Sequence, residues 1–360
     1  MSERHFAQNY AEARAKFRRA AEVQDLALER HAHPDARGAE GEELSMDCAR
    51  LGPAQPDRLL ILSSATHGVE GFCGSGAQIA LLHDEEFVSR ARASGAAVLF
   101  VHAVNPYGFS HWGRTNEDNV DLNRNFLDHA RPHPANPAYA EVHPLLVSDS
   151  WPPSDARAAA IADYIAKRGQ LAFQQAVSGG QYDSPDGLFF GGRTPTWSNR
   201  TIRAVLRPFR TSVRRVLWID FHTGLGPYGH GEIIQSGRDD DTELARASAV
   251  WGTQVKSIYK GTSVSARLDG LLAFAAYDEL PQAEYTGCVI EYGTLPVMRV
   301  LQALRAENWL RRNLDASATQ RAALRREIRD AFYCDADDWK ESVVAQAHSA
   351  ALDGLLALDR

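Results

Sequence analysis

Two short segments of the chain carry histidine and carboxylate side chains in patterns that can bind a metal ion. In the first, His67 and Glu70 are three residues apart and follow the apolar run 59–64. Placed in the turn between a strand and a helix, such a pair can converge on one cation, and the glycines after His67 would let the backbone approach a ligand closely. A second H-x-x-E, at 83–86, follows a helical run inside a charged stretch and predicts only a solvated helix end.

The second segment, 218–224, reads Trp-Ile-Asp-Phe-His-Thr-Gly. Alternate residues of a strand share a face, so Asp220 and His222 point the same way. Catalytic zinc sites typically use three protein ligands and leave a fourth position for water, and two imidazoles with one carboxylate are a common set. His222 would complete that set with His67 and Glu70. A buried histidine bonded to backbone is the alternative explanation for His222.

A lone carboxylate lies inside the apolar strand expected at 288–292, with the sequence Cys-Val-Ile-Glu-Tyr. Burying a carboxylate is costly unless it is paired or functional. Desolvation also raises its pKa toward the value that a general base needs near neutrality. Glu291 is therefore a candidate catalytic base, with a buried structural ion pair as the alternative.

The segment 114–125 is too polar for a core element, with ten polar or charged residues, two of them arginines. Arg114 and Arg124 near a metal would favour anion recognition, because a guanidinium group binds carboxylates through two parallel hydrogen bonds. A polar loop held by side-chain caps is the alternative explanation.

Four of the polar residues fall at the ends of expected strands or inside them: His67, Asn105, His222 and Glu291. Strands are expected at 59–64, 98–104, 216–221, 232–235 and 288–292, and helices between them at 74–94, 154–177, 196–210, 239–255 and 267–279. This alternation predicts an α/β fold with a mixed, mostly parallel central sheet covered by helices on both faces. Because ligands bind at the carboxyl ends of strands in such sheets, we expect one pocket built from distant parts of the sequence.

A shared pocket favours a single catalytic domain over residues 1–360, with a core at about 45–296. An N-terminal helix is expected within 1–35, over residues 5–31, and a helical extension over 297–360. The Pro- and His-rich stretch 129–155 predicts a long ordered loop, with its histidines at the surface: His129, His133 and His143.

Composition excludes several other classes. A net charge of −7 gives no basic surface for nucleic acid. The four cysteines form no C-x-x-C pair, which argues against a zinc ribbon or a disulfide framework. The N-terminus lacks the apolar core of a signal peptide, and no apolar run reaches the ~20 residues that span a bilayer. We therefore expect a cytoplasmic protein with no nucleic-acid or membrane partner; its oligomeric state is left open.

Together the motifs resemble those of the zinc carboxypeptidase (carboxypeptidase A-like) clan, which also includes aspartoacylases and succinylglutamate desuccinylases. The order agrees: H-x-x-E, then D-x-N-R, then a lone histidine after a strand, then a glutamate in a strand, over about residues 58 to 295. The segment 180–192 has no counterpart in the digestive enzymes and is typical of a bacterial branch. The resemblance implies the zinc carboxypeptidase-like fold and one zinc ion per chain.

The resemblance also implies a role for individual residues. His67, Glu70 and His222 match the metal ligands. Asp121 matches the carboxylate that orients the first ligand histidine, and Glu291 matches the general base.

Three further residues match groups that handle the substrate. Asn123 and Arg124 correspond to the pair that grips the terminal carboxylate, and Arg114 resembles the arginine that polarises the scissile carbonyl. The tyrosine that caps the substrate in digestive enzymes has three candidates here: Tyr259, Tyr277 and Tyr292.

The implied function is a zinc-dependent, metallocarboxypeptidase-like hydrolase that uses metal-activated water to cleave an amide or peptide bond next to a free carboxylate. Its substrate would be a small peptide or an acyl amino acid. One alternative is an N-acyl amino acid amidohydrolase of the aspartoacylase type, and another is a non-catalytic binding protein that retains the fold. The sequence has neither the G-x-S-x-G elbow of a serine hydrolase nor the phosphate loop of an NTPase.

Overall fold

The computed structural model describes residues 2–359 and places a seven-stranded sheet at their centre, in the order β1-β2-β4-β3-β5-β7-β6. The four central strands are parallel: β4 (Ala97–His102), β3 (Arg58–Ser64), β5 (Arg215–Tyr228) and β7 (Glu284–Gly293). The outer strands pair antiparallel: β1 (Ala27–Arg37), β2 (Glu43–Leu51) and β6 (Gly231–Gln235). The predicted α/β class, with a mixed and mostly parallel sheet, is confirmed.

The central strands are apolar because helices cover both of their faces. Every residue of β4 is buried. Along β3, Leu60 and Leu62 belong to one hydrophobic core, whereas Leu59 and Ile61 belong to the core on the opposite face. Alternate side chains of one strand thus enter two different cores.

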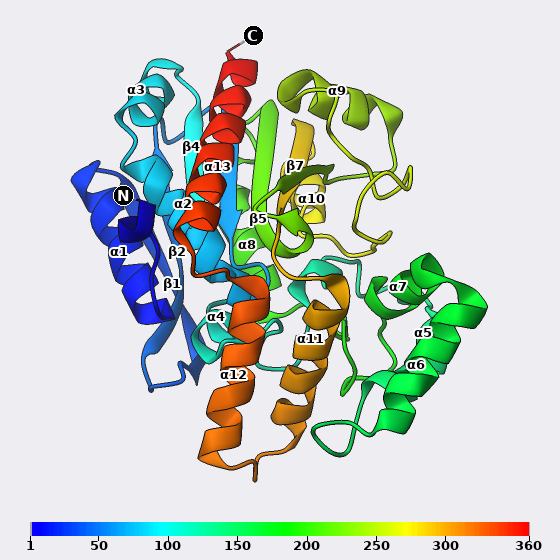
Figure 1. Cartoon of the computed structure of the whole chain (residues 1–360). Coiled ribbons are helices and arrows are strands. Elements are labelled where there is room, and N and C mark those ends of the chain that lie inside the picture. Colours follow the sequence, from blue (N-terminus) through cyan, green and yellow to red (C-terminus); the bar gives the residue numbers. More distant parts are fainter. Residues whose placement is uncertain (1, 360) are drawn as a thin grey trace.

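The helices form a layer on each face of the sheet and a third group at one end (Figure 1). One face is covered by α1 (Tyr10–Val23), α2 (Gly71–Leu82), α3 (Glu85–Ala93), α9 (Asp241–Trp251) and α13 (Asp337–Leu358). The other face is covered by α8 (Trp197–Leu206) and α10 (Phe274–Glu279). Lying near the carboxyl ends of the central strands are α4 (Pro106–His111), α5 (Pro137–Leu146), α6 (Asp155–Arg168), α7 (Gln170–Ser178), α11 (Val297–Arg312) and α12 (Ala318–Phe332).

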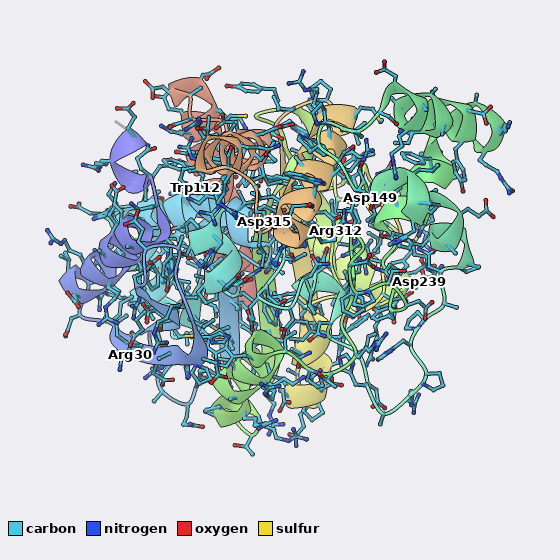
Figure 2. All side chains as sticks on the ribbon, turned by 90° about the horizontal axis from the view of Figure 1, so that it is seen from below. Arg30, Trp112, Asp149, Asp239, Arg312 and Asp315 are labelled. Atoms are coloured by element: carbon cyan, nitrogen blue, oxygen red, sulfur yellow. The ribbon has the colours of Figure 1, made fainter. Side chains whose placement is uncertain are left out.

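Figure 2 views the molecule from this end, with α11 near its middle and α5–α7 to one side. Hydrogen bonds connect α11 to the segment that follows α5. Arg312 donates to the Ser148 carbonyl, and the Trp309 indole donates to the Asp149 carbonyl at 3.2 Å. Within residues 2–359, none of the helices combines the length and apolar character needed to span a bilayer.

Three secondary-structure predictions were wrong. The N-terminal helix expected over 5–31 ends at Val23 and is followed by strand β1. The expected loop 129–155 contains helix α5. The helix expected over 267–279 begins only at Phe274.

The sheet also begins before the predicted core start at about residue 45, because β1 and β2 lack apolar runs. β1 is a largely exposed edge strand. β2 buries a charge, Asp47, which the Arg14 guanidinium of α1 neutralises at 2.6 Å.

Candidate active site

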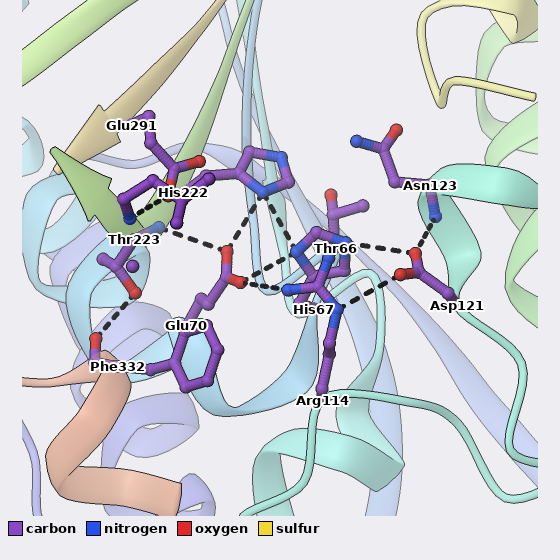
Figure 3. A network of polar contacts seen from close by, with 12 residues as sticks. Thr66, His67, Glu70, Arg114, Asp121, Asn123, His222, Thr223, Glu291 and Phe332 are labelled. Atoms are coloured by element: carbon purple, nitrogen blue, oxygen red, sulfur yellow. Dashed lines mark hydrogen bonds and ion pairs between the residues drawn. The ribbon is translucent and has the colours of Figure 1, made fainter. Parts of the chain in front are cut away.

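The three predicted metal ligands lie together at the carboxyl-terminal side of the parallel strands (Figure 3). His67 follows β3 and precedes the short 3-10 helix η2 (Gly68–Glu70), and His222 lies on the neighbouring strand β5. One ligand atom from each of His67, Glu70 and His222 lies within 4.8 Å of the others. All three side chains are buried. They could therefore hold a metal ion.

Nδ1 of each histidine faces Glu70, and a second carboxylate on the other side of each ring fixes the orientation of that ring. His67 Nδ1 lies 2.8 Å from Glu70 Oε1, and His222 Nδ1 lies 3.0 Å from Glu70 Oε2. The other ring nitrogens face carboxylates: His67 Nε2 is 3.1 Å from Asp121, and His222 Nε2 is 2.5 Å from Asp220. Metal-binding imidazoles are commonly oriented by carboxylates in this way. The donor set of two Nδ1 atoms and one carboxylate fits zinc.

Asp220 is a site residue to which the sequence analysis gave no role. Its carboxylate accepts hydrogen bonds from Ser63 Oγ at 2.6 Å and from Thr66 Oγ1 at 2.8 Å. The Thr66 bond is to Oδ2, the oxygen that contacts His222, and the Ser63 bond holds Oδ1. The available signal was its position two residues before His222, on the same face of the strand.

We expect Asp220→Asn to weaken metal affinity about 10- to 100-fold, because the amide holds His222 less firmly and makes it less basic. Competition with a coloured chelator measures this change. Asp278→Asn, which alters an exposed ion pair with Arg203, is the matched control and should leave affinity unchanged. Wild-type affinity in Asp220→Asn would show that Asp220 does not support the site.

The charges around the ligands favour a cation. Burial alone would raise the pKa of Glu70, but the neighbouring His67 and His222 hold it well below its usual value. Burial likewise opposes ionisation of Asp121, but the positive charges of Arg114 and Arg124 outweigh burial and hold its pKa well below its usual value. Both carboxylates are therefore ionised at neutral pH.

Glu291 lies on β7 directly opposite His222 of β5 in the parallel register. It is 8% exposed, and its Oε1 accepts a hydrogen bond from the Leu225 amide at 2.9 Å. Burial, reinforced by the negative charge of Glu70, raises its pKa from 4.5 to about 7. A carboxyl group with this pKa can both accept and return a proton near neutrality.

A glycine keeps the space beside Glu291 open. Gly224 has φ +137°, and a Cβ there would lie 3.0 Å from the Phe332 ring and 3.4 Å from Glu291 Oε1. A side chain at this position would therefore be strained and would crowd the carboxylate.

The raised pKa of Glu291 predicts a pH-dependent stability difference in metal-free protein. Between pH 4.5 and 7 the unfolded carboxyl ionises while the folded one stays protonated, so stability falls as pH rises through this window. The total loss is on the order of 3 kcal/mol for a shift of this size. Because Glu291→Gln lacks this loss, it should be the more stable protein at pH 8 and similar to wild type at pH 4. Urea unfolding after chelation tests this; equal stabilities at pH 8 would contradict it.

Arg114 and Arg124 lie beside the ligand group and line the same cavity. Arg114 donates to Asp121 and to Glu70, each at 3.1 Å, so much of its guanidinium is engaged by these carboxylates. Arg124 donates to the Asn123 and Ser178 carbonyls, while its buried Nε has no partner. Arg124 thus lines the cavity and has one buried N–H group without a hydrogen-bond partner.

The segment 180–192 supports these arginines, which is a role that the sequence did not reveal. The Asp121 amide donates to the Phe190 carbonyl at 2.8 Å, and the Tyr182 hydroxyl donates to the Arg124 carbonyl at 2.6 Å. The ring of Phe189, whose φ is +54°, lies 5.1 Å from the Arg114 guanidinium and 5.7 Å from that of Arg124.

The glycines after His67 serve packing rather than the approach of a ligand. A Cβ at Gly68 would lie 2.1 Å from the backbone of Gly108, and one at Gly71 would lie 2.5 Å from the Phe109 ring. They let η2 and α2 pack closely against α4.

The candidate capping tyrosines are engaged elsewhere, and none of them lines the cavity. The hydroxyl of Tyr259 donates to the Gly237 carbonyl, that of Tyr277 to Glu243, and that of Tyr292 to the Val343 carbonyl.

The histidines at residues 129, 133 and 143 are partly exposed and lie outside the group of possible metal ligands. His83 is exposed at the end of α2, as predicted.

The cavity beside the ligands has a volume of about 140 Å³. Its polar wall includes Asn123, Arg124 and Glu291, and much of the rest is apolar. One cavity at the strand ends is lined by three buried side chains that could hold a metal ion, a carboxyl group with a pKa near neutrality and an arginine. These features define an α/β protein with a candidate metal-dependent active site.

Comparison with known proteins assigns the chain to a family. Residues 6–346 match the model of the family described as "Protein of unknown function (DUF2817)", and the chain belongs to this family. No curated protein matches it in sequence.

Similar solved structures include a carboxypeptidase A, a succinylglutamate desuccinylase and an aspartoacylase family protein. Carboxypeptidase A from Helicoverpa armigera aligns over 90% of this chain and 74% of its own, with 13% identity and a TM-score of 0.42. The succinylglutamate desuccinylase from Chromobacterium violaceum aligns over 84% and 75%, with 15% identity and a TM-score of 0.37. An aspartoacylase family protein from Mesorhizobium loti aligns over 79% and 66%, with 14% identity and a TM-score of 0.38.

Proposed function

We propose that the chain is a zinc-dependent hydrolase that cleaves an amide or peptide bond next to a free carboxylate. The observation that carries the proposal is the group His67, Glu70 and His222, whose ligand atoms lie within 4.8 Å of one another beside a carboxyl group with a raised pKa. Structural zinc is not needed to stabilise a chain of 360 residues, so a metal held there would serve chemistry.

A bound zinc ion would supply Lewis acidity to the carbonyl under attack and to the attacking water. Glu291 takes a proton from that water and returns it to the leaving nitrogen. Its pKa of about 7 suits both transfers. Because the Leu225 amide holds Oε1, Oε2 is the oxygen that exchanges the proton.

The substrate carboxylate is bound by Arg124 and Asn123. The unpartnered Nε of Arg124 supplies a charged donor. Asn123 Oδ1 already accepts from the Leu272 amide at 2.9 Å, which directs the side-chain amide nitrogen of Asn123 to the ligand. Arg114 would polarise the carbonyl with any N–H that its carboxylate partners leave free.

Hydrolysis of N-acetyl-leucine and glycyl-leucine by zinc-loaded protein tests the proposal, with the corresponding carboxamides as controls. We expect turnover of at least one of the free acids and at least tenfold slower turnover of its carboxamide, which lacks the charge that Arg124 binds. Cleavage of the acetyl compound alone would favour the aspartoacylase-type reaction. Binding of both acids without any hydrolysis would favour a non-catalytic binding protein.

A further inference from the structure

The cavity has an apolar wall on the side away from the carboxylate anchor. In Figure 3, Phe332 and Thr223 lie on one side of the ligand group, and Asp121 and Asn123 lie on the other. The part of the described cavity lining that comes from residues 223–225, 297–304 and 332 contains no charged residue. We call its apolar members the α11 wall: Leu225, Val297, Met298, Val300, Leu301, Leu304 and Phe332.

Four polar groups of residues 223–225, beside the α11 wall, already have partners. Thr223 Oγ1 donates to the Phe332 carbonyl at 2.6 Å, and the Gly224 carbonyl accepts from Thr294 Oγ1 at 3.1 Å. The amides of Thr223 and Leu225 donate to Glu70 and Glu291. A peptide placed here would bury its own N–H and C=O groups without replacing their hydrogen bonds to water, which is unfavourable.

Two exposed apolar side chains extend the α11 wall to the rim of the cavity. Val297 and Met298, in the first turn of α11, are each 42% exposed. Exposed apolar side chains that adjoin a cavity are typical of a site that covers them with an apolar ligand.

We infer that the α11 wall receives an apolar acyl group, so that the substrate is an N-acyl amino acid with an aliphatic or aromatic acyl chain rather than a peptide. This inference rests on the proposed function. The amino acid carboxylate lies at Arg124, and the acyl substituent lies against Leu301 and Phe332. Hydrolysis breaks the amide C–N bond and joins the water oxygen to the acyl carbon. The products are an apolar carboxylate and a free amino acid, whose nitrogen takes both water protons.

N-pentanoyl-leucine and N-acetylglycyl-leucine form the matched test pair, because their acyl chains have the same length and only the second contains an amide. We expect zinc-loaded protein to favour the pentanoyl compound at least tenfold in kcat/KM. It should also favour pentanoyl-leucine over acetyl-leucine tenfold or more, since each buried methylene is worth about fourfold. Calorimetric binding to Glu291→Gln should give the same order without turnover.

A double variant, Val297→Ser with Met298→Ser, should lower the pentanoyl-to-acetyl ratio several-fold. Leu314→Ser changes another exposed apolar residue, in the turn between α11 and α12, that does not line the cavity, and it should leave the ratio unchanged. Equal or better cleavage of N-acetylglycyl-leucine would overturn the inference but keep the proposed function. No cleavage of any of these compounds would overturn both.

Discussion

Glu291→Gln should lower kcat by roughly a thousandfold while zinc stays bound, because general acid–base groups contribute about 10²–10⁴ to rate. The substitution keeps the shape of the side chain, and its amide oxygen can still accept from the Leu225 amide. It removes only the group that takes the proton from water and returns it to the leaving nitrogen. Steady-state kinetics with N-acyl-leucine, together with metal analysis, measure both effects.

The matched control is Glu284→Gln, which changes an exposed glutamate at the start of the same strand, β7. It should leave kcat and zinc content unchanged. If Glu291→Gln kept more than a tenth of wild-type kcat, Glu291 would not be the base. If it lost both activity and zinc, its role would lie in holding the metal site.

Arg124→Met should raise KM for a substrate with a free carboxylate by roughly 10- to 100-fold, because a charge-assisted hydrogen bond is worth about 1.5–3 kcal/mol. The rate for the matching carboxamide should change much less. The ratio of kcat/KM between acid and carboxamide is therefore the decisive readout, because a general loss of structure would lower both.

Two further variants serve as controls for Arg124→Met. Arg124→Lys keeps the charge but not the planar donor geometry and should recover part of the ratio. Arg131→Met removes an exposed arginine a few residues away and should leave the ratio unchanged. An unchanged ratio in Arg124→Met would place the carboxylate site elsewhere.

The sequence predicted the central part of the fold because its strands are apolar on both faces. The strands at Arg58–Ser64, Ala97–His102 and Glu284–Gly293 coincide with the expected runs, although the third begins earlier. Position at strand ends also predicted that His67 and His222 would meet, although they are far apart in sequence. β1 and β2 carry no such run, and Asp47 becomes buried only because Arg14 of another element lies against it. A contact of this kind cannot be read from a local pattern.

The surroundings of the site were harder to predict than its motifs. His222 was expected to end its strand, but β5 continues to Tyr228. His222 is therefore paired within the sheet with Glu291 of the neighbouring strand β7. Asp220 and Phe189 gain their positions through tertiary contacts. Asp220 accepts hydrogen bonds from Ser63 and Thr66, and the Phe189 ring lies against the two guanidinium groups. The contribution of Phe332 follows from the packing of α12 against Gly224, which no spacing rule in the sequence indicates.

Metal content of the purified protein, wild type beside His222→Ala, tests the central claim most directly. Three buried ligands with two supporting carboxylates predict about one zinc per wild-type chain and loss of most of it in the variant. Asp278→Asn changes a residue of α10 that is not part of the ligand group, and it should keep the metal. A wild-type protein that holds no metal and takes up no added zinc would contradict the account, as would a His222→Ala variant that binds zinc like wild type.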